Sequence, residues 1–514
     1  MQNFPPRVLK FAIVFAGLAG IMSEYLLSTV ATYLLGDAVK QWALIISTML
    51  LAMGLGSGAS VGVKRRLIDI FILVEILLSF FIAISVLAGY LAIPYIGFRY
   101  LALYSLSFFI GFLIGYEIPL ATRINDQYEE LRLNIAGIMQ RDYIGAFIGG
   151  LLFVFVAVPY FGLTYVPVAL AAVNFTIAIA LFYAFNKFIE LRKTIFTAFA
   201  LLFCALLAIF LKSEDILFFQ EQKLYKDKIV HYEQTPYQRI VVTKWKDDFW
   251  LYLNGNQQFS SFDEDRYHEP LVHPAMLLAK RPENILVLGG GDGLAVREIL
   301  KHKSVKSVTL VDLDPAVTKL AKENEIFLEL NKGAINDKRV TVLNQDGYTF
   351  IEQSPQIFDV IFIDLPDPKS IDLSRLYSQE FYQFCKKHLA KGGILVTQSV
   401  SPVFSSKSFM CILKTLEEAG FSVLPYHNNI PTMGDWGWIL SMQKENGLRR
   451  EDLKKQFQEA SLDGLDLSFL DPELLATLPI FWKGAFQGME QIKVNRLLEP
   501  ALLEYYKNDR WDLY

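Results

Sequence analysis

The chain has 514 residues, too many for one ordinary domain, and 53% of them are hydrophobic while only 20% are charged. Its net charge of −4, without any basic tract, excludes an evident nucleic-acid surface. The three cysteines have neither metal-binding nor redox spacing, so we interpret Cys204, Cys385 and Cys411 as small buried hydrophobic residues.

Apolar residues are concentrated in the first 212 positions. Seven runs there are long enough to cross a bilayer, which takes about 20 apolar residues each. These runs are residues 9–35, 42–63, 67–92, 100–120, 138–160, 163–185 and 194–211. Small residues cluster at 54–59 and 145–150, which favours close helix packing. We therefore predict a multi-pass helical bundle over 1–212, in contact with lipid in the cell membrane.

Basic residues are distributed unevenly between the loops of this bundle. The loops opposite the N-terminus carry only Lys40, Arg99 and Lys212. The N-terminus and the loops on its side carry many more: Arg7, Lys10, Lys64, Arg65, Arg66, Arg123, Arg132, Lys187, Arg192 and Lys193. The positive-inside rule places the N-terminus in the cytoplasm. Seven crossings would then place residues 213–514 outside, so either one run does not cross or the second half is extracytoplasmic.

Several ionisable residues lie within the apolar runs, where an uncompensated charge is costly. They are Glu24, Glu75, Glu117, Arg141 and Asp142. One interpretation is an internal ion pair, such as Arg141 with a glutamate. The other is a path or a sensor for an organic cation.

Residues 213–280 are predicted to form a small β-rich subdomain. Two strand-like runs, 239–244 and 249–253, precede the tripeptide Asn254-Gly255-Asn256. An Asn-Gly pair next to such runs indicates a β-hairpin.

Residues 281–445 alternate between strand and helix patterns. The expected strands are 285–288, 307–311, 340–343, 359–363, 393–397, 421–425 and 438–442. Alternating βα units predict a doubly wound, mostly parallel, Rossmann-like sheet with its ligand at the carboxyl ends of the strands. The last segment, 446–514, is expected to be helical, and no chemistry is assigned to it.

A glycine turn, residues 289–293, lies between the first of these strands and a helix. Glycines at this place let the backbone approach a ligand. The next strand ends in Asp312, where a carboxylate accepts hydrogen bonds from ribose hydroxyls. Asp292, Asp346 and Asp364 also lie at strand ends. A row of helix caps is the alternative explanation, but the set favours a nucleoside site, and the acids disfavour a phosphorylated ligand.

The soluble half resembles the spermidine synthase family, the polyamine aminopropyltransferases. The resemblance covers about residues 237–442, and the whole chain resembles the bacterial subgroup with an N-terminal membrane bundle. It is carried by Tyr237-Gln238, Phe262-Asp263-Glu264, Tyr267-His268-Glu269, GGGDGLAVRE at 289–298, Asp312-Leu313-Asp314, Gln345-Asp346-Gly347, DLPDP at 364–368 and LYSQEFY at 376–382.

This resemblance implies transfer of the aminopropyl group of decarboxylated S-adenosylmethionine to putrescine, which gives spermidine and methylthioadenosine. It implies Asp364 as the proton acceptor, a homodimer, and neither a prosthetic group nor a metal. The implied donor side comprises Gln238, Gly289, Gly291, Asp292, Asp312, Asp346 and Gly347. The implied acceptor side comprises Tyr267, His268 and Asp367.

Two departures from the family pattern affect the acceptor side. Leu365 and Pro366 stand where the family usually has Ser or Thr between the two aspartates. Met433 stands where a tyrosine often follows Pro-Thr, so Trp436 or Asp435 is expected to line the acceptor pocket instead. The identity of the amine therefore stays open among putrescine, other diamines and longer polyamines.

The reaction itself requires groups of this kind. An amine with a pKa of about 10.4 is protonated at neutral pH and cannot attack carbon until it loses a proton. A carboxylate within hydrogen-bond reach can accept that proton and aim the lone pair. Two alternatives remain: a polyamine transporter or sensor with a non-catalytic nucleoside-binding domain, and an S-adenosylmethionine-dependent methyltransferase.

Overall fold

The computed structural model describes residues 4–92, 96–126, 128–444 and 449–509. The chain divides into two compact units, Met1–Ile229 and Val230–Tyr514. Each unit has hydrophobic cores of its own, one in the first unit and three in the second.

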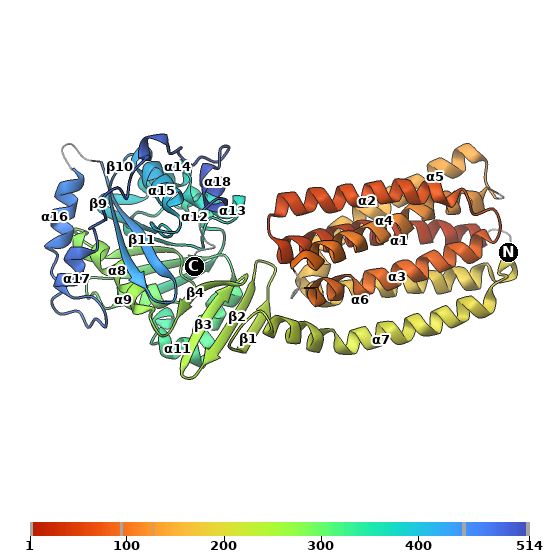
Figure 1. Cartoon of the computed structure of the whole chain (residues 1–514), viewed down its shortest axis with the longest axis horizontal. Coiled ribbons are helices and arrows are strands. Elements are labelled where there is room, and N and C mark those ends of the chain that lie inside the picture. Colours follow the sequence, from red (N-terminus) through yellow and green to blue (C-terminus); the bar gives the residue numbers. More distant parts are fainter. Residues whose placement is uncertain (1–3, 93–95, 127, 445–448, 510–514) are drawn as a thin grey trace. The chain divides into compact units, whose positions relative to one another are not determined.

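The first unit is helical throughout the residues that are described. Six stretches of helix are long and apolar enough to cross a membrane by length and composition, and one of them, Leu131–Ala184, contains two of the expected runs. That stretch is interrupted at Gly162, which has φ 61°, so the chain starts a new helix there. The α-helices are α1 Phe4–Leu35, α2 Ala38–Ser60, α3 Leu67–Leu91, α4 Ile96–Asn125, α5 Leu131–Leu152, α6 Gly162–Ala184 and α7 Arg192–Gln222 (Figure 1).

Glycines let two pairs of these helices approach backbone to backbone. A Cβ atom on Gly145 of α5 would lie 1.8 Å from the Val14 carbonyl oxygen of α1. A Cβ on Gly56 of α2 would lie 2.0 Å from the Phe112 carbonyl oxygen of α4. Side chains at these positions would force the helices apart, which is the role expected of small residues in helix bundles.

Helix α7 extends beyond the boundary expected from the sequence. The apolar run ends at Leu211, but the helix continues to Gln222 through a charged segment. The two compact units consequently divide between Ile229 and Val230 rather than after residue 212. Helix propensity does not require apolar residues, so the end of the apolar run does not mark the end of the helix.

The second unit begins with a four-stranded antiparallel sheet. Its strands follow in chain order, β1 Lys228–Gln234, β2 Arg239–Trp245, β3 Asp248–Leu253 and β4 Asn256–Ser260. Strands β3 and β4 are joined at Asn254 and Gly255, which have φ values of 51° and 79°. These are the positive values that a tight hairpin turn requires. The predicted hairpin is therefore confirmed, whereas β1 was not expected.

The second sheet has seven strands in the order β10-β11-β9-β8-β5-β6-β7. Strands β5 to β9 are parallel, and β11 is antiparallel to both β9 and β10. All seven strands expected from the sequence form: β5 Asn284–Gly289, β6 Ser307–Asp312, β7 Val340–Asn344, β8 Phe358–Asp364, β9 Leu389–Gln398, β10 Phe421–Ile430 and β11 Gly434–Gln443. The Rossmann-like prediction is confirmed, with a mixed sheet.

Helices cover both faces of this sheet, as the alternation of its side chains shows. Along β5, Ile285 and Val287 belong to one hydrophobic core, while Leu286 and Leu288 belong to another. The main covering helices are α8 Asp265–Leu278, α9 Leu294–Leu300, α12 Gly347–Gln353, α14 Gln379–Lys387 and α15 Ser406–Glu418. A strand that is apolar on both sides is typical of a buried parallel sheet.

The C-terminal segment is less helical than expected. It contains three short α-helices among its described residues, α16 Arg450–Gln458, α17 Pro472–Thr477 and α18 Ala501–Lys507, and the rest is irregular. Leu453 and Phe457 of α16 join the core with Ile285, whereas Leu502 and Tyr506 of α18 join the core on the other face. The segment therefore packs against the sheet domain at both faces.

Candidate active site

The glycine turn between β5 and α9 lies against the ends of two neighbouring strands. Gly289 has φ 83°, and a Cβ atom there would lie 2.0 Å from the Asp364 carbonyl oxygen at the end of β8. A Cβ on Gly291 would lie 2.5 Å from Asp312 Oδ2 at the end of β6. Only glycine fits either position, so the turn and both strand-end acids form one site.

The Asp312 carboxylate is held by the backbone around it. Its Oδ2 accepts a hydrogen bond from the Gly291 N–H at 3.1 Å, and its Oδ1 accepts one from the Asp314 N–H at 2.9 Å. Burial raises the pKa of Asp312 to about 6, although these two N–H groups oppose that shift. The side chain is therefore fixed in orientation at the place expected for ribose recognition.

Gln238 reaches the same strand end from the antiparallel sheet. Its Nε2 donates to Asp314 Oδ2 at 3.1 Å, and the Thr235 hydroxyl donates to the same oxygen at 2.7 Å. Asp314 also caps helix α10, Pro315–Glu323, by accepting from the Ala316 N–H. Gln238 thus contacts Asp314, an acid two residues after Asp312 to which the sequence analysis gave no role, and its contact with a donor stays a prediction.

Asp364, the predicted proton acceptor, forms a short hydrogen bond with Tyr267 of α8. The Tyr267 hydroxyl donates to Asp364 Oδ1 at 2.6 Å. Burial raises the pKa of Asp364 to about 6, with the Asp292 charge adding to it, while His268 and the Tyr267 hydroxyl act in the opposite direction. Burial also raises the pKa of Asp292, whose Oδ1 accepts from the Leu294 N–H at 2.8 Å.

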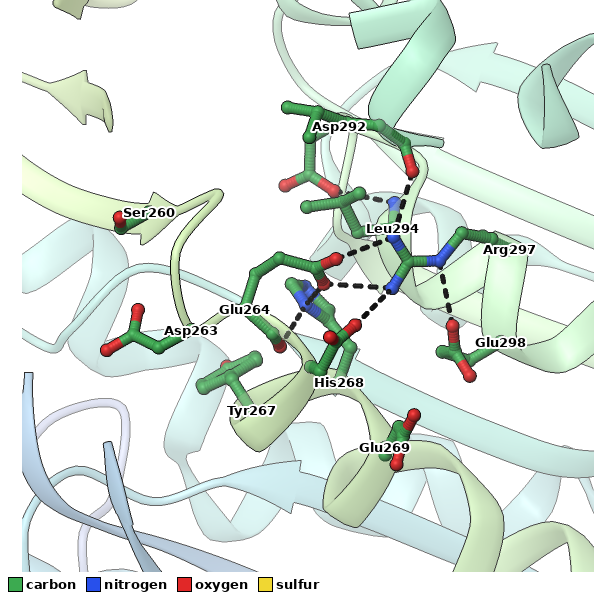
Figure 2. Close-up of polar contacts among 12 residues, drawn as sticks. Ser260, Asp263, Glu264, Tyr267, His268, Glu269, Asp292, Leu294, Arg297 and Glu298 are labelled. Carbon is green, nitrogen blue, oxygen red and sulfur yellow. Dashed lines mark hydrogen bonds and ion pairs between the residues drawn. The ribbon is translucent and has the colours of Figure 1, made fainter. Parts of the chain in front are cut away.

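A buried ion network supports Tyr267 and its neighbour His268 (Figure 2). Arg297 of α9 contacts both oxygens of Glu264, at 2.6 and 2.9 Å, and its Nε contacts Glu298 at 2.8 Å. His268 Nδ1 lies 2.9 Å from Glu264 Oε2. Burial disfavours the charged imidazole, but Glu264 outweighs it and raises the pKa of His268 to about 9. His268 is therefore a cation at neutral pH, and Glu264 is the carboxylate that it contacts.

Asp367, on the loop after β8, receives a hydrogen bond from the far end of the chain. The Tyr506 hydroxyl of α18 donates to Asp367 Oδ2 at 2.7 Å. Lys369 Nζ lies 3.9 Å from the same oxygen and also contacts Asn256 Oδ1 of β4. Tyr506 and Lys369 were both missed by the sequence analysis, and no sequence signal links Tyr506 to a residue 139 positions away.

The loop itself is held by Gln398, which the sequence analysis did not name, and by Tyr377, which it named only as part of the motif at 376–382. Gln398 Nε2, at the end of β9, donates to the Leu365 carbonyl at 2.7 Å and to the Tyr377 hydroxyl at 2.6 Å. The Tyr377 hydroxyl in turn contacts the carbonyls of Leu365 and Pro366, each at 3.2 Å. The backbone of Leu365-Pro366 thus accepts the bonds that fix the loop between the two aspartates.

The Asp346 carboxylate makes more contacts within the protein than the sequence suggested. It caps α12 by accepting from the Thr349 N–H at 2.9 Å, and its Oδ2 pairs with Arg375 at 2.6 Å. Gly347 is the first residue of α12. This carboxylate therefore serves as a helix cap as well as a candidate contact for a ligand.

Trp436 and Asp435 differ in their surroundings. Asp435 pairs with His427 at 2.8 Å, so its carboxylate already has a partner. Trp436 is buried in the same hydrophobic core as Tyr267, and its indole N–H has no hydrogen-bond partner among the described residues. Trp436 is the better candidate for the acceptor side.

The mixed seven-stranded sheet, with a glycine turn after β5 and Asp312 at the end of β6, is a Rossmann-like fold of the methyltransferase type. Residues 264–455 match the model of the spermine/spermidine synthase domain.

Full-length relatives extend this match to the helical unit. The chain is 37% identical to a polyamine aminopropyltransferase of Oceanobacillus iheyensis over 99% of this chain and 98% of the relative. It is 38% identical to that of Leptospira interrogans over 98% of each, and 39% identical to polyamine aminopropyltransferase 2 of Aquifex aeolicus over 97% and 98%. The chain belongs to the polyamine aminopropyltransferase family.

Among solved structures, a spermidine synthase in complex with the transition state analogue AdoDATO is 23% identical, with a TM-score of 0.46, over 51% of this chain and 89% of that one.

Proposed function

We propose that this transferase moves the aminopropyl group of decarboxylated S-adenosylmethionine to a diamine, with putrescine as the first choice, releasing methylthioadenosine. The observation that carries the proposal is the partly buried Asp364–Tyr267 hydrogen bond of 2.6 Å, placed against the glycine turn. It combines a candidate proton acceptor with a candidate nucleoside site. The names of the relatives, which align over both units, support the same reaction.

The donor side would be formed by the glycine turn and the acids around it. Asp312, fixed by two backbone N–H groups, would accept hydrogen bonds from the ribose hydroxyls. Gln238 and Asp292 would contact the cationic tail of the donor. Asp346 and Gly347 would lie at the adenine, where Arg375 holds the Asp346 carboxylate in place. Anionic side chains favour a donor that carries a sulfonium and an ammonium group.

The acceptor side would place one amine next to Asp364 and the other next to Asp367. The ammonium gives a proton to the Asp364 carboxylate, and the freed lone pair attacks the methylene carbon beside the sulfonium. A C–N bond forms as the C–S bond breaks, and its electron pair goes to sulfur. A pKa of about 6 makes Asp364 a stronger base than an ordinary aspartate while it remains ionised at neutral pH.

The remaining acceptor residues would shape the pocket. Tyr267 orients the Asp364 carboxylate, and His268 stabilises Tyr267's helix through Glu264. The unpartnered indole N–H of Trp436 would point to an acceptor atom. Tyr506 would hold Asp367 for the distal amine.

We propose that the first unit lies in the cell membrane and the second carries the reaction. The apolar helices support this by length and composition. The corresponding division is a helical bundle, a small β subdomain, the Rossmann-like domain and a C-terminal segment. Which side of the membrane carries the reaction is a question for protease accessibility of residues 230–514 in sealed vesicles.

The test of the reaction is an assay on the purified full-length chain. Decarboxylated S-adenosylmethionine is supplied with putrescine, cadaverine or spermidine, and methylthioadenosine and the aminopropylated amine are followed by mass spectrometry. We expect both products in equal amounts. Methyl transfer from S-adenosylmethionine would instead support the methyltransferase alternative, and donor binding without product from any amine would support the sensor or transporter.

A further inference from the structure

Three polar side chains of the helical unit are buried and have atoms without a hydrogen-bond partner in the described part of the chain. Glu75 of α3 and Asn174 of α6 are completely buried, and Glu117 of α4 is 2% exposed. Both carboxylate oxygens of Glu75, both amide atoms of Asn174 and Oε1 of Glu117 have no hydrogen-bond partner among the described residues. Buried polar groups nearly always have a partner in the protein, an ordered water or an ion. These orphaned atoms are therefore candidates for contact with a bound ligand.

Helices α3 and α6 are antiparallel and in register at this level. The Ser79 hydroxyl donates to the Ala171 carbonyl at 2.6 Å. Further along, the Asp69 carboxylate accepts from the Leu191 N–H at 2.7 Å. Moving from Ser79 towards Asp69 on α3 therefore corresponds to moving from Ala171 on α6 towards Leu191, which lies between α6 and α7.

Glu75 and Asn174 face each other across these two helices. Glu75 is four residues from Ser79, about 6 Å along α3, and Asn174 is three residues from Ala171, about 4.5 Å in the same direction along α6. Residues three or four apart share a helix face, so both side chains lie on the facing surfaces that the Ser79–Ala171 bond identifies. Glu117, on the neighbouring helix α4, is close enough to Glu75 for their charges to interact.

Three basic side chains of the unit contact groups other than these carboxylates. Lys10 pairs with Glu129 at 2.8 Å. Arg123 donates to the carbonyls of Ser60 and Val63. Arg141 donates to the Gly137 carbonyl at 2.7 Å, and no pair between Arg141 and a glutamate is found in the described residues. The expected pair of Arg141 with a glutamate is therefore not formed, and no ion pair of Glu75 or Glu117 with a basic side chain is found in the described part of the chain either.

We propose that Glu75, Glu117 and Asn174 form a binding site for one desolvated monovalent cation inside the helical unit. The carboxylates supply the charge, and the amide oxygen of Asn174 supplies a neutral ligand. An alkali ion and the terminal ammonium of an amine present the same chemistry to these oxygens. A divalent metal is disfavoured, since no group of three His, Cys, Asp or Glu among the described residues could hold one.

This site is separate from the aminopropyl reaction and does not rest on it. Its residues belong to Met1–Ile229, whereas the candidate active site belongs to Val230–Tyr514. The helices around this cation site bury it and so isolate it from water. The helical unit is thus more than an anchor in this proposal, because it takes up a cation of its own.

The test is carbodiimide labelling of the full-length chain in detergent, at constant pH and ionic strength. Dicyclohexylcarbodiimide reacts with buried carboxyl groups, and mass spectrometry locates the label at Glu75 and Glu117. Sodium, potassium, putrescine and spermidine are added separately, with choline as the balancing ion. We expect at least one of the four cations to slow labelling several-fold. The proposal would be overturned if labelling proceeds equally fast with all four cations, or if its rate changes with pH but not with the cation.

Matched variants test whether any protection from carbodiimide labelling comes from this site. Asn174→Val should keep the labelling and lose the protection, whereas Thr176→Val, an exposed position on the same helix, should keep both. Glu75→Gln should abolish protection at Glu117. Asp367→Asn distinguishes the amines: protection by putrescine or spermidine that disappears in this variant comes from the active site and counts against the proposal for amines.

Discussion

Asp364 carries the largest share of the proposed chemistry at the scale of single residues. Asp364→Asn keeps the size of the side chain and can still accept the Tyr267 hydrogen bond, but it cannot take a proton. We expect turnover to fall by about 10²-fold or more with donor affinity unchanged, since general base catalysis contributes roughly that much. Single-turnover formation of methylthioadenosine measures it.

The control for this variant is Asp372→Asn, the same change at an exposed position a few residues further along the chain. It should leave turnover unchanged. Near-normal rates in Asp364→Asn would remove Asp364 from the role of proton acceptor.

The raised pKa of Asp364 also has a consequence for stability. Its pKa is about 6 in the folded chain, against 3.8 for an ordinary aspartate, so ionisation opposes folding. The protonated carboxyl group contributes favourably to the stability of the folded state. This contribution is complete below about pH 4 and is lost as the pH rises through about 6. At pH 8, Asp364→Asn should therefore unfold at a higher temperature than the parent, and its free energy of unfolding should be larger by on the order of 2–3 kcal/mol at most. At pH 4 the two proteins should differ little. Thermal unfolding at both pH values measures this, and an equal effect at pH 4 and pH 8 would contradict it.

Tyr506 provides a residue-scale test of the acceptor pocket. Tyr506→Phe removes the hydroxyl that donates to Asp367 but keeps the packing of the ring. We expect KM for the diamine to rise several-fold while KM for the donor stays the same, because Asp367 loses its orientation and the donor side is untouched. Tyr505→Phe, the adjacent residue on the same helix, is the matched control. A parallel rise in both KM values would show a general loss of structure instead.

At the scale of elements, the contact between α8 and α9 depends on buried charge. Arg297 bridges Glu264 and Glu298 (Figure 2), and removing it takes a buried cation from both carboxylates. His268 still contacts Glu264, and Lys301 still contacts Glu298. Arg297→Met should lower the free energy of unfolding by about 3–5 kcal/mol, the usual cost of breaking a buried pair. Denaturant unfolding measures the change. The double variant Glu264→Gln/Arg297→Met should recover part of the loss, and a double variant as unstable as the sum of both single variants would contradict the pairing.

The elements of the sheet domain could be predicted because their sequences are locally consistent. A strand such as β5 is apolar on both sides, and the glycines that follow can serve only as a turn against a neighbouring backbone. The hairpin at Asn254-Gly255 is marked by residues that tolerate positive φ. Strand β1 carries no such mark, since its residues alternate in exposure without a clear apolar face.

The candidate site could be predicted only where its residues belong to local motifs. Asp312 and Asp364 end buried strands, and that position made them candidates, whereas the role expected of Asp364 came from the family resemblance. Tyr506 lies on a short helix far along the chain, and nothing in its own surroundings indicates that its hydroxyl meets Asp367. Arg375 lies in a 3₁₀ turn, and its pairing with Asp346 depends on how that turn packs. Long-range side-chain pairs of this kind require the folded structure.

At the scale of the whole molecule, the separate hydrophobic cores predict that the second unit can fold without the first. The chain from residue 226 onwards, expressed alone, should be soluble, bind the donor and transfer the aminopropyl group at a rate similar to that of the full chain. Activity assays on the two purified forms check this. An inactive but folded fragment would show that the helical unit takes part in the reaction. The inferred cation site predicts no effect of Glu75→Gln on transfer by the full chain.

The hydrogen bond between Tyr506 and Asp367 also sets an order of events during protein synthesis. The ribosome makes the helical unit first, then the glycine turn and the loop that bears Asp367, and only 139 residues later the tyrosine that orients this carboxylate. In the proposed mechanism, a nascent chain therefore makes the residues of its nucleoside site well before those of its amine pocket. Amine-consuming activity would then begin only after α18 has been translated, long after the helices of the first unit have left the ribosome.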